Sequence, residues 1–215
     1  MKNSDFSEAK KRMINEDLIP RGIKNERVLR AFKDVVREEF LPDKLKAKAY
    51  QDRPLPISEG QTISQPYIVA EMIQALDPQR DDKILEIGTG SGYAAAVLAE
   101  IVETVHGVER YQSLVKQSQQ NLAELDYNNI NLHAGDGTKG WPEEAPYDGI
   151  LVSAAAPEVP QSLLKQLVEG GYLVIPVGTK SVQELYQIQK LVDGKLHKNE
   201  LGRVRFVPLI GEEGW

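Results

Sequence analysis

Three glycines at alternate positions follow a short apolar run and are well placed in this chain to contact a ligand. Residues 83–87 (Lys-Ile-Leu-Glu-Ile) precede Gly88, Gly90 and Gly92, and an alanine-rich segment begins at Tyr93. Glycine allows a sharp backbone turn and lets amide groups approach a bound molecule at the start of a helix. The pattern therefore predicts a ligand-binding turn between a strand and a helix, with an ordinary turn as the alternative.

The spacing of these glycines indicates which ligand fits. A dinucleotide-binding fingerprint places its third glycine one residue later than this chain does. The shorter spacing, with Glu86 two residues before the first glycine, resembles the nucleotide-binding loop of methyltransferases that use S-adenosylmethionine. This resemblance implies that the loop binds the cofactor through Glu86, Gly88, Gly90, Ser91 and Gly92.

Acidic residues follow the next two predicted strands. Glu109 lies 21 residues after Gly88, where an open α/β nucleotide site places a carboxylate that accepts the ribose hydroxyls. A simple ion pair with Arg110 is the alternative. Asp136 stands directly before Gly137, and its carboxylate suits the exocyclic amine of adenine, with an Asp-Gly turn as the alternative. We assign Glu109, Asp136 and Gly137 to the predicted cofactor site.

Alternating short apolar strands and amphipathic helices must position these residues. The sequence predicts strands near residues 83–87, 104–108, 130–134, 148–153, 172–177, 184–190 and 204–209, with helices near 66–76, 93–101, 111–125 and 160–168. This order is typical of an open α/β sheet, whose ligands bind at the carboxyl ends of the strands. The Asp193-Gly194 pair predicts a hairpin turn, so the sheet should be antiparallel near the end of the chain.

The first part of the chain has a different pattern. Residues 1–50 have the periodicity of amphipathic helices, and Asn25 is the predicted N-cap of a helix that ends near Phe40. Residues 50–65 have neither a helical nor a strand period. Long segments of this kind within compact domains are often binding loops or lids. We therefore expect helices that brace an active-site loop.

Composition limits the possible functions. The chain of 215 residues suits one domain, with residues 1–79 as the helical part and active-site loop and 80–215 as the cofactor-binding α/β core. Its formal charge is −6 and no segment concentrates Lys or Arg together with aromatic residues, so nucleic acid is not an expected partner. Cysteine is absent and the three histidines are dispersed, so neither a thiol nucleophile nor a metal centre is expected. No apolar run approaches the roughly 18 residues of a membrane span, and we expect a cytoplasmic monomer.

Several motifs together resemble one methyltransferase family. The segments are residues 54–66 (Pro-Leu-Pro-Ile-Ser-Glu-Gly-Gln-Thr-Ile-Ser-Gln-Pro), the glycine loop, and residues 135–137 (Gly-Asp-Gly), 140–142 (Gly-Trp-Pro) and 204–209 (Val-Arg-Phe-Val-Pro-Leu). They are similar to segments of the protein-L-isoaspartate (D-aspartate) O-methyltransferases, and the resemblance covers nearly the whole chain. The Gln-Thr-Ile-Ser-Gln-Pro element is the most diagnostic. Ser58-Glu59 and Ser153 depart from the residues usual in the family and leave the assignment intact.

The resemblance implies a fold and a set of site residues. The fold is the Rossmann-like α/β sheet of S-adenosylmethionine-dependent methyltransferases, with about seven strands that are mostly parallel, the sixth strand being antiparallel, and with N-terminal helices. Ser64 corresponds to the active-site residue, and Thr62 and Ile63 lie beside the methionine part of the cofactor. Residue type and position alone make a helix cap ahead of Pro66 an equal alternative for Ser64.

The implied reaction transfers a methyl group from S-adenosylmethionine to the free α-carboxylate of L-isoaspartyl residues in damaged peptides and proteins. The methyl ester then converts through a succinimide, and the cofactor leaves as S-adenosylhomocysteine. Whether D-aspartyl residues also react stays open. Because the carboxylate is already ionised at pH 7, no general base is needed, and we expect Ser64 to position it by a hydrogen bond.

Other functions fit parts of the pattern. They are a different methyltransferase using the same cofactor, an NAD-dependent oxidoreductase, and a cofactor-binding module without activity. The Thr62-Ile63-Ser64 segment disfavours the first, and the glycine spacing disfavours the second. Methylation of nucleic-acid bases is disfavoured because residues 153–157 (Ser-Ala-Ala-Ala-Pro) lack the aromatic residue that grips a base.

Overall fold

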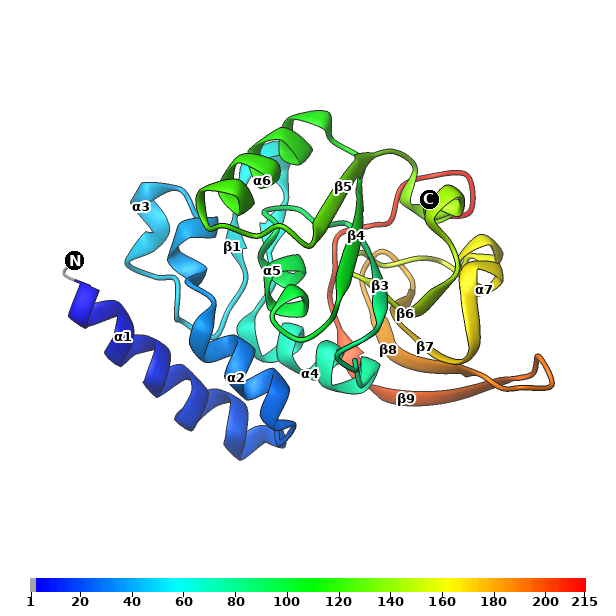
Figure 1. Cartoon of the computed structure of the whole chain (residues 1–215), viewed down its shortest axis with the longest axis horizontal. Coiled ribbons are helices and arrows are strands. Elements are labelled where there is room, and N and C mark those ends of the chain that lie inside the picture. The colour runs from blue at the N-terminus through cyan, green and yellow to red at the C-terminus, as the bar shows by residue number, and fades with distance from the viewer. Residues whose placement is uncertain (1–2) are drawn as a thin grey trace.

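A seven-stranded sheet forms the centre of the molecule (Figure 1). The computed structural model describes residues 3–215. The strands in chain order are β3 (Lys83–Ile87), β4 (Thr104–Glu109), β5 (Ile130–Ala134), β6 (Tyr147–Val152), β7 (Leu167–Gly178), β8 (Gln183–Lys190) and β9 (Leu196–Val204). Their order in the sheet is β5-β4-β3-β6-β7-β8-β9.

One strand runs against the others. The strands from β5 across to β7 pair in parallel, whereas β8, the sixth strand in chain order, pairs antiparallel with both β7 and β9. A tight turn joins β8 to β9, with Gly194 at φ +76° and the Leu191 N–H donating to the Lys195 carbonyl over 2.8 Å. The predicted mostly parallel sheet, its antiparallel sixth strand and the Asp193-Gly194 hairpin are therefore confirmed.

The sheet is covered on both faces. Its helices are α4 (Pro66–Leu76), α5 (Tyr93–Ala99), α6 (Gln112–Glu124) and α7 (Gln161–Gln166). On β3, Ile84 belongs to a core shared with α4, α5 and the N-terminal helices, whereas Leu85 and Ile87 belong to a second core shared with α7. All three side chains are fully buried. Alternate residues of a strand point to opposite faces, so an apolar run of this kind is the pattern of a strand buried on both sides.

The strand order places the carboxyl end of β3 at the centre of the sheet. Strands β4 and β5 lie on one side of β3, and β6 and β7 lie on the other. Ligands of open α/β sheets bind at this change in winding, outside the carboxyl ends of the strands. The glycine loop follows β3 directly and leads into α5, so the fold puts it at this point.

The N-terminal helices begin as the sequence predicts. Helix α1 (Asn3–Arg12) continues through a π-helical turn, Met13–Leu18. Asn25 caps α2 (Glu26–Asp34), its side-chain oxygen accepting the N–H groups of Arg27 and Val28 at 3.0 and 3.4 Å. The predicted N-cap is confirmed.

The end of α2 differs from the prediction. The helix ends at Asp34, and not near Phe40. At Val35 the backbone is extended, with φ −67° and ψ 131°, and a 3₁₀ turn (Arg37–Phe40) and the short helix α3 (Asp43–Lys46) follow. Val35 and Val36 are successive β-branched residues, which favour extended backbone over helix. Their apolar side chains had suggested a longer helical face.

The segment that was expected to be irregular contains a small hairpin. Strands β1 (Leu55–Pro56) and β2 (Thr62–Ile63) pair antiparallel, separate from the main sheet. A 3₁₀ turn joins them, in which Glu59 and Gly60 have φ values of +57° and +66°. Strands this short lack a detectable sequence period, which explains why the pattern predicted a loop.

The predicted last strand, 204–209, is wrong in position. The seventh strand of the sheet is β9 (Leu196–Val204), and the residues after it leave the sheet edge. They run beside Ala155, whose N–H donates to the Val207 carbonyl at 2.8 Å and whose carbonyl accepts the Leu209 N–H at 2.7 Å. Pro208, between them, has no N–H to give to a ladder. The tail thereby crosses the carboxyl ends of the strands, which matters for the site.

Three further features concern the described residues. Within residues 3–215, every helix is too short or too polar to cross a membrane. In the same part of the chain, His, Asp and Glu side chains form no cluster of three or more suited to a metal ion. Met13 and Met72 lie in the first core and are only 1% and 2% exposed.

Candidate active site

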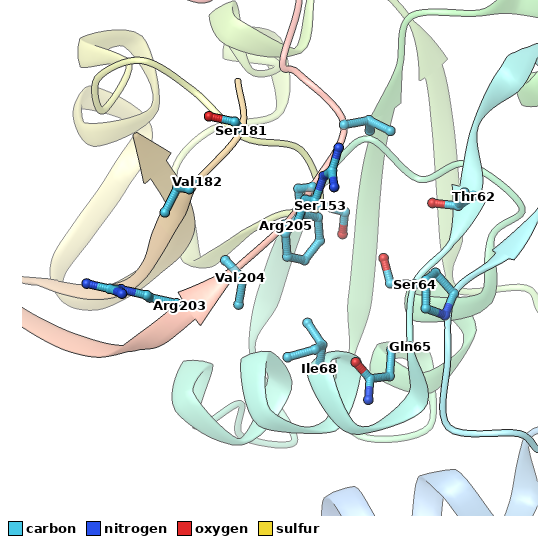
Figure 2. Close-up of a pocket in the computed structure, with 13 residues that line it drawn as sticks. Thr62, Ser64, Gln65, Ile68, Ser153, Ser181, Val182, Arg203, Val204 and Arg205 are labelled. Carbon is cyan, nitrogen blue, oxygen red and sulfur yellow. The ribbon is translucent and has the colours of Figure 1, made fainter. Parts of the chain in front are cut away.

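Two cavities meet at the carboxyl ends of the central strands. The first, of about 440 Å³, has walls of Gly88, Gly90 and Glu109 and is named the glycine-loop cavity. The second, of about 550 Å³, has Arg203 and Arg205 in its lining and is named the arginine cleft (Figure 2). Thr62, Ser153 and Val207 line both cavities. The two cavities therefore share part of their wall.

The backbone conformation of the glycine loop requires glycine at three positions. Gly88, Gly90 and Gly92 have φ values of +80°, +53° and +88°, a region in which side chains other than glycine are strained. Gly92 is the N-cap residue of α5. The loop thus turns from β3 into α5 with its backbone open to the cavity, as the spacing predicted.

Glu86 is a buried carboxylate with an unused oxygen. It is 1% exposed, and only Oε1 has a partner, the Ser153 hydroxyl, which donates at 3.2 Å. Within the described chain, Oε2 and the nearby Thr89 hydroxyl have no hydrogen-bond partner. Burial raises the pKa of Glu86 to about 8. Because buried polar atoms are normally paired, these two orphaned groups fit a bound molecule that carries donors or positive charge.

Glu109 is the last residue of β4 and lies in the wall of the glycine-loop cavity. Its carboxylate lines the glycine-loop cavity, with Oε2 accepting the Gly90 N–H and Oε1 accepting the Tyr111 N–H, both at 3.0 Å. In residues 3–215 it makes no ion pair with Arg110, whose guanidinium lies over the Tyr111 ring instead. Each carboxylate oxygen keeps a second lone pair for a ligand.

Asp136 and Gly137 are placed differently. Gly137 lines the glycine-loop cavity, whereas Asp136 is not part of its wall. Asp136 Oδ1 accepts the Thr138 N–H at 2.9 Å, and Oδ2 accepts the Glu212 N–H at 2.9 Å. The carboxylate therefore caps a local turn and anchors the C-terminal tail. Its contact with adenine stays a prediction.

Ser64 lines the arginine cleft and also a small cavity, of about 40 Å³, that Glu86 shares. Figure 2 shows its side chain on the same side of the cleft as that of Thr62. It is not the helix cap: Gln65 occupies the N-cap position of α4 without a capping side chain. That alternative is therefore wrong.

Asp52 does the capping instead. Its Oδ1 accepts the Tyr67 N–H of α4 at 2.9 Å, while Oδ2 accepts the Gln65 side-chain amide and pairs with Arg21, both at 2.7 Å. Because this carboxylate satisfies the start of the helix, the Ser64 hydroxyl is left for the cleft.

Arg37, which the sequence pattern did not indicate, holds the backbone of Ser64 in place. Arg37 is fully buried, and it donates from Nε to the Ala49 carbonyl at 2.7 Å and from Nη2 to the Ser64 carbonyl at 3.0 Å. Its guanidinium also lies 4.6 Å from the centre of the Tyr93 ring, on the first residue of α5. One side chain thus connects the active-site segment to the helix after the glycine loop.

The tip of the small hairpin covers the glycine-loop cavity. Gly60 and Gln61 contribute to its wall. The Ser113 hydroxyl of α6 donates to Glu59 Oε1 at 2.6 Å, and the Ser58 hydroxyl donates to Gln117 Oε1 at 3.3 Å. Ser58 and Glu59 therefore dock the hairpin on α6.

Comparison with known proteins identifies the family. Residues 8–214 match the family model described as protein-L-isoaspartate(D-aspartate) O-methyltransferase. The chain belongs to this family. A protein-L-isoaspartate O-methyltransferase of Pelotomaculum thermopropionicum is 55% identical over 206 residues, which cover 96% of this chain and 90% of the relative. Another, of Syntrophobacter fumaroxidans, is 52% identical over 211 residues, 98% of each chain.

Solved structures of the family agree with the fold. One protein-L-isoaspartate O-methyltransferase superposes with a TM-score of 0.85 at 30% identity and covers 95% of this chain and 67% of that chain. A second, from Plasmodium falciparum and in complex with S-adenosyl-L-homocysteine, has a TM-score of 0.78 at 29% identity and covers 94% and 97%. The predicted methyltransferase fold and its cofactor, S-adenosylmethionine, are confirmed, and an NAD-dependent oxidoreductase is not supported.

Proposed function

We propose that this protein transfers a methyl group from S-adenosylmethionine to the free α-carboxylate of L-isoaspartyl residues in damaged proteins and peptides. The ester then converts through a succinimide without the enzyme. One observation supports this function above the others: Ser64 lines the arginine cleft and, with Glu86, the adjoining small cavity. The family-specific segment therefore borders both the cleft that we assign to the peptide and the small cavity beside the glycine loop, which supports the proposal.

The residues around the glycine loop suit the cofactor. We assign Glu86 to the methionine part of the cofactor. The loop residues Gly88, Gly90, Ser91 and Gly92 would form the turn that packs against the bound cofactor. The orphaned Glu86 Oε2 supports this assignment because the amino group of the methionine part is a cation. When bound, S-adenosylmethionine supplies a methyl group on a positively charged sulfur.

The other assigned residues complete the cofactor site. Glu109 would accept the ribose hydroxyls, and Asp136 and Gly137 would face adenine. Thr62 and Ile63, in β2, would lie beside the methionine part. The walls of the glycine-loop cavity support Glu109, Gly137 and Thr62 directly.

Ser64 is the residue that we assign to the substrate. The substrate carboxylate needs no base, since at pH 7 it is more than about 99% ionised. The described lining of the arginine cleft contains no His, Asp or Glu that could act as one. Ser64 would donate a hydrogen bond to one carboxylate oxygen and so aim the other at the methyl carbon. Orientation of this kind can lower a barrier by on the order of 7 to 11 kcal/mol.

The oligomeric state, the cellular location and the absence of a nucleic-acid substrate are part of the same proposal. We infer that the protein acts as a cytoplasmic monomer and that nucleic acid is not a substrate. The net charge of −6 is unfavourable for binding phosphates. Light scattering during size-exclusion chromatography would measure the mass in solution, and a stable dimer would overturn the monomer.

Methyl transfer to paired peptides tests the function. A synthetic isoaspartyl peptide, its normal aspartyl twin and its D-aspartyl analogue are each incubated with the enzyme and S-adenosylmethionine labelled in the methyl group. We expect base-labile label in the isoaspartyl peptide and none in the aspartyl twin, and the third arm decides on D-aspartyl residues. Cofactor binding without label in any peptide would indicate an inactive module and contradict the proposal.

A further inference from the structure

The arginine cleft is positively charged within an acidic protein. Its only charged lining residues in the described chain are Arg203 and Arg205, and no carboxylate belongs to the lining itself. The whole chain carries a formal charge of −6. A local excess of positive charge of this kind favours an anionic ligand.

The two arginines are not equivalent. Arg203 donates from Nε to Glu184 Oε1 at 3.0 Å, which offsets its charge. Arg205 is exposed, and within residues 3–215 it makes no ion pair and no side-chain hydrogen bond. Arg205 is therefore the cation in the cleft that is free to bind a substrate group.

The backbone that carries Arg205 is fixed. The next residue, Phe206, donates its N–H to Gln183 Oε1 at 2.9 Å, and the Val207 carbonyl accepts the Ala155 N–H at 2.8 Å. Arg205 and Gln65 both line the cleft, and Figure 2 shows them on different parts of its wall. A cation on a fixed segment is suited to reading one position of a bound peptide.

We propose that Arg205 binds a second carboxylate of the substrate, that of an Asp or Glu residue that flanks the isoaspartyl residue. This inference rests on the proposed function, in which Ser64 holds the reacting carboxylate. A guanidinium on the reacting carboxylate would neutralise the oxygen that must attack, so a free cation is better used on a neighbouring acid. The enzyme therefore prefers damaged sites in acidic sequences.

The expected preference is moderate and depends on salt. Exposed ion pairs contribute up to about 1 kcal/mol, which is about a fivefold change in an equilibrium constant. Salt screens such pairs, with a Debye length of about 10 Å at 0.1 M and about 3 Å at 1 M. We expect an acidic neighbour to raise kcat/KM by about threefold to fivefold at low salt and by less at 1 M salt.

Matched isoaspartyl peptides test this inference. Three peptides differ only in the residues that flank the isoaspartyl position: Gln on both sides, Glu before it, or Glu after it. Labelled methyl transfer gives kcat/KM for each with the wild type, Arg205→Gln, Arg205→Glu and Arg205→Lys. The control variant is Lys44→Gln, which removes an exposed positive charge outside the cleft. Binding of S-adenosylhomocysteine shows that each variant is folded.

The readout is the ratio of kcat/KM between acidic and neutral peptides. We expect a ratio of about 3 to 5 for at least one Glu peptide in the wild type, in Arg205→Lys and in the control. It should fall to about 1 in Arg205→Gln and below 1 in Arg205→Glu. Equal rates for all three peptides in the wild type, or a ratio that Arg205→Glu leaves unchanged, would overturn the inference. Failure of the proposed function would give a different result, because no isoaspartyl peptide would then be methylated.

Discussion

Ser64 is held by its backbone and leaves its hydroxyl free. Its carbonyl accepts a hydrogen bond from the buried Arg37 guanidinium, and Asp52 caps the start of α4. The hydroxyl can therefore serve the substrate without loss of a structural contact. This separation of roles predicts that a change of the hydroxyl affects turnover and leaves the fold intact.

The substitution Ser64→Ala tests that role. A hydrogen bond to a charged group contributes about 1.5 to 3 kcal/mol, so kcat for an isoaspartyl peptide should fall about tenfold to a hundredfold. The dissociation constant of S-adenosylhomocysteine should change little. Ser181→Ala, which removes another of the serine hydroxyls in the lining of the cleft, is the matched control and should have a smaller effect. Unchanged turnover of Ser64→Ala would refute the role.

Glu86 gives a prediction for stability against pH. Its pKa is raised from 4.5 to about 8 by burial, so between these values the unfolded state ionises and the folded state keeps the proton. Rising pH then favours unfolding, by at most about 1.4 kcal/mol per pH unit, and the effect ends above the folded pKa. Glu86→Gln lacks this ionisation. Urea unfolding without cofactor should therefore show the variant gaining stability over the wild type from pH 5 to 8. A difference that does not vary with pH would contradict the prediction.

At the scale of elements, Arg37 links the helical part to the active-site segment. It contacts the carbonyls of Ala49 and Ser64 and the ring of Tyr93, so its loss would loosen β2 relative to α5. A lysine cannot reproduce this forked geometry, since it is a point charge on a flexible stem.

The variant Arg37→Lys should therefore lose both stability and activity. Leaving a buried carbonyl unpaired costs about 1 to 3 kcal/mol of unfolding free energy. In assays at temperatures well below the unfolding temperature, we also expect a lower kcat, because Ser64 is misplaced. KM for the peptide should change less. A purely structural role would lower stability alone. Arg30→Lys, on the exposed side of α2, is the control and should match the wild type.

The elements show what the sequence could and could not predict. The glycine loop, the Asn25 cap and the Asp193-Gly194 hairpin were predictable because each depends on local backbone chemistry. Strand β9 was misplaced because it is an edge strand whose exposed residues are mostly polar, so no apolar alternation marks it. Arg37 was missed for a related reason: its sequence neighbours do not distinguish a buried arginine from a solvated one. Both errors concern contacts between distant parts of the chain.

At the scale of the molecule, we propose that residues 1–79 and 80–215 form one domain. A single core contains Leu18, Phe32 and Ile73 from the first part and Ile84 and Val174 from the second. Parts that share a core of this kind unfold together.

A single cooperative transition is therefore expected. Thermal unfolding followed by far-UV and near-UV circular dichroism should give coincident midpoints, and S-adenosylhomocysteine at 100 times its dissociation constant should stabilise the folded state by about 2.7 kcal/mol. Two separated transitions, of which only one responds to this ligand, would show that the parts are independent.

The positions of the sulfur-containing side chains affect how the protein resists oxidation. The chain has no cysteine, and Met13 and Met72 are sealed in the interior at 1% and 2% exposure. Peroxide attacks accessible thiolates and thioethers first, converting them to sulfenic acids and sulfoxides. Within residues 3–215 neither group lines the proposed catalytic centre, so the enzyme should stay active at oxidant concentrations that inactivate thiol-dependent enzymes.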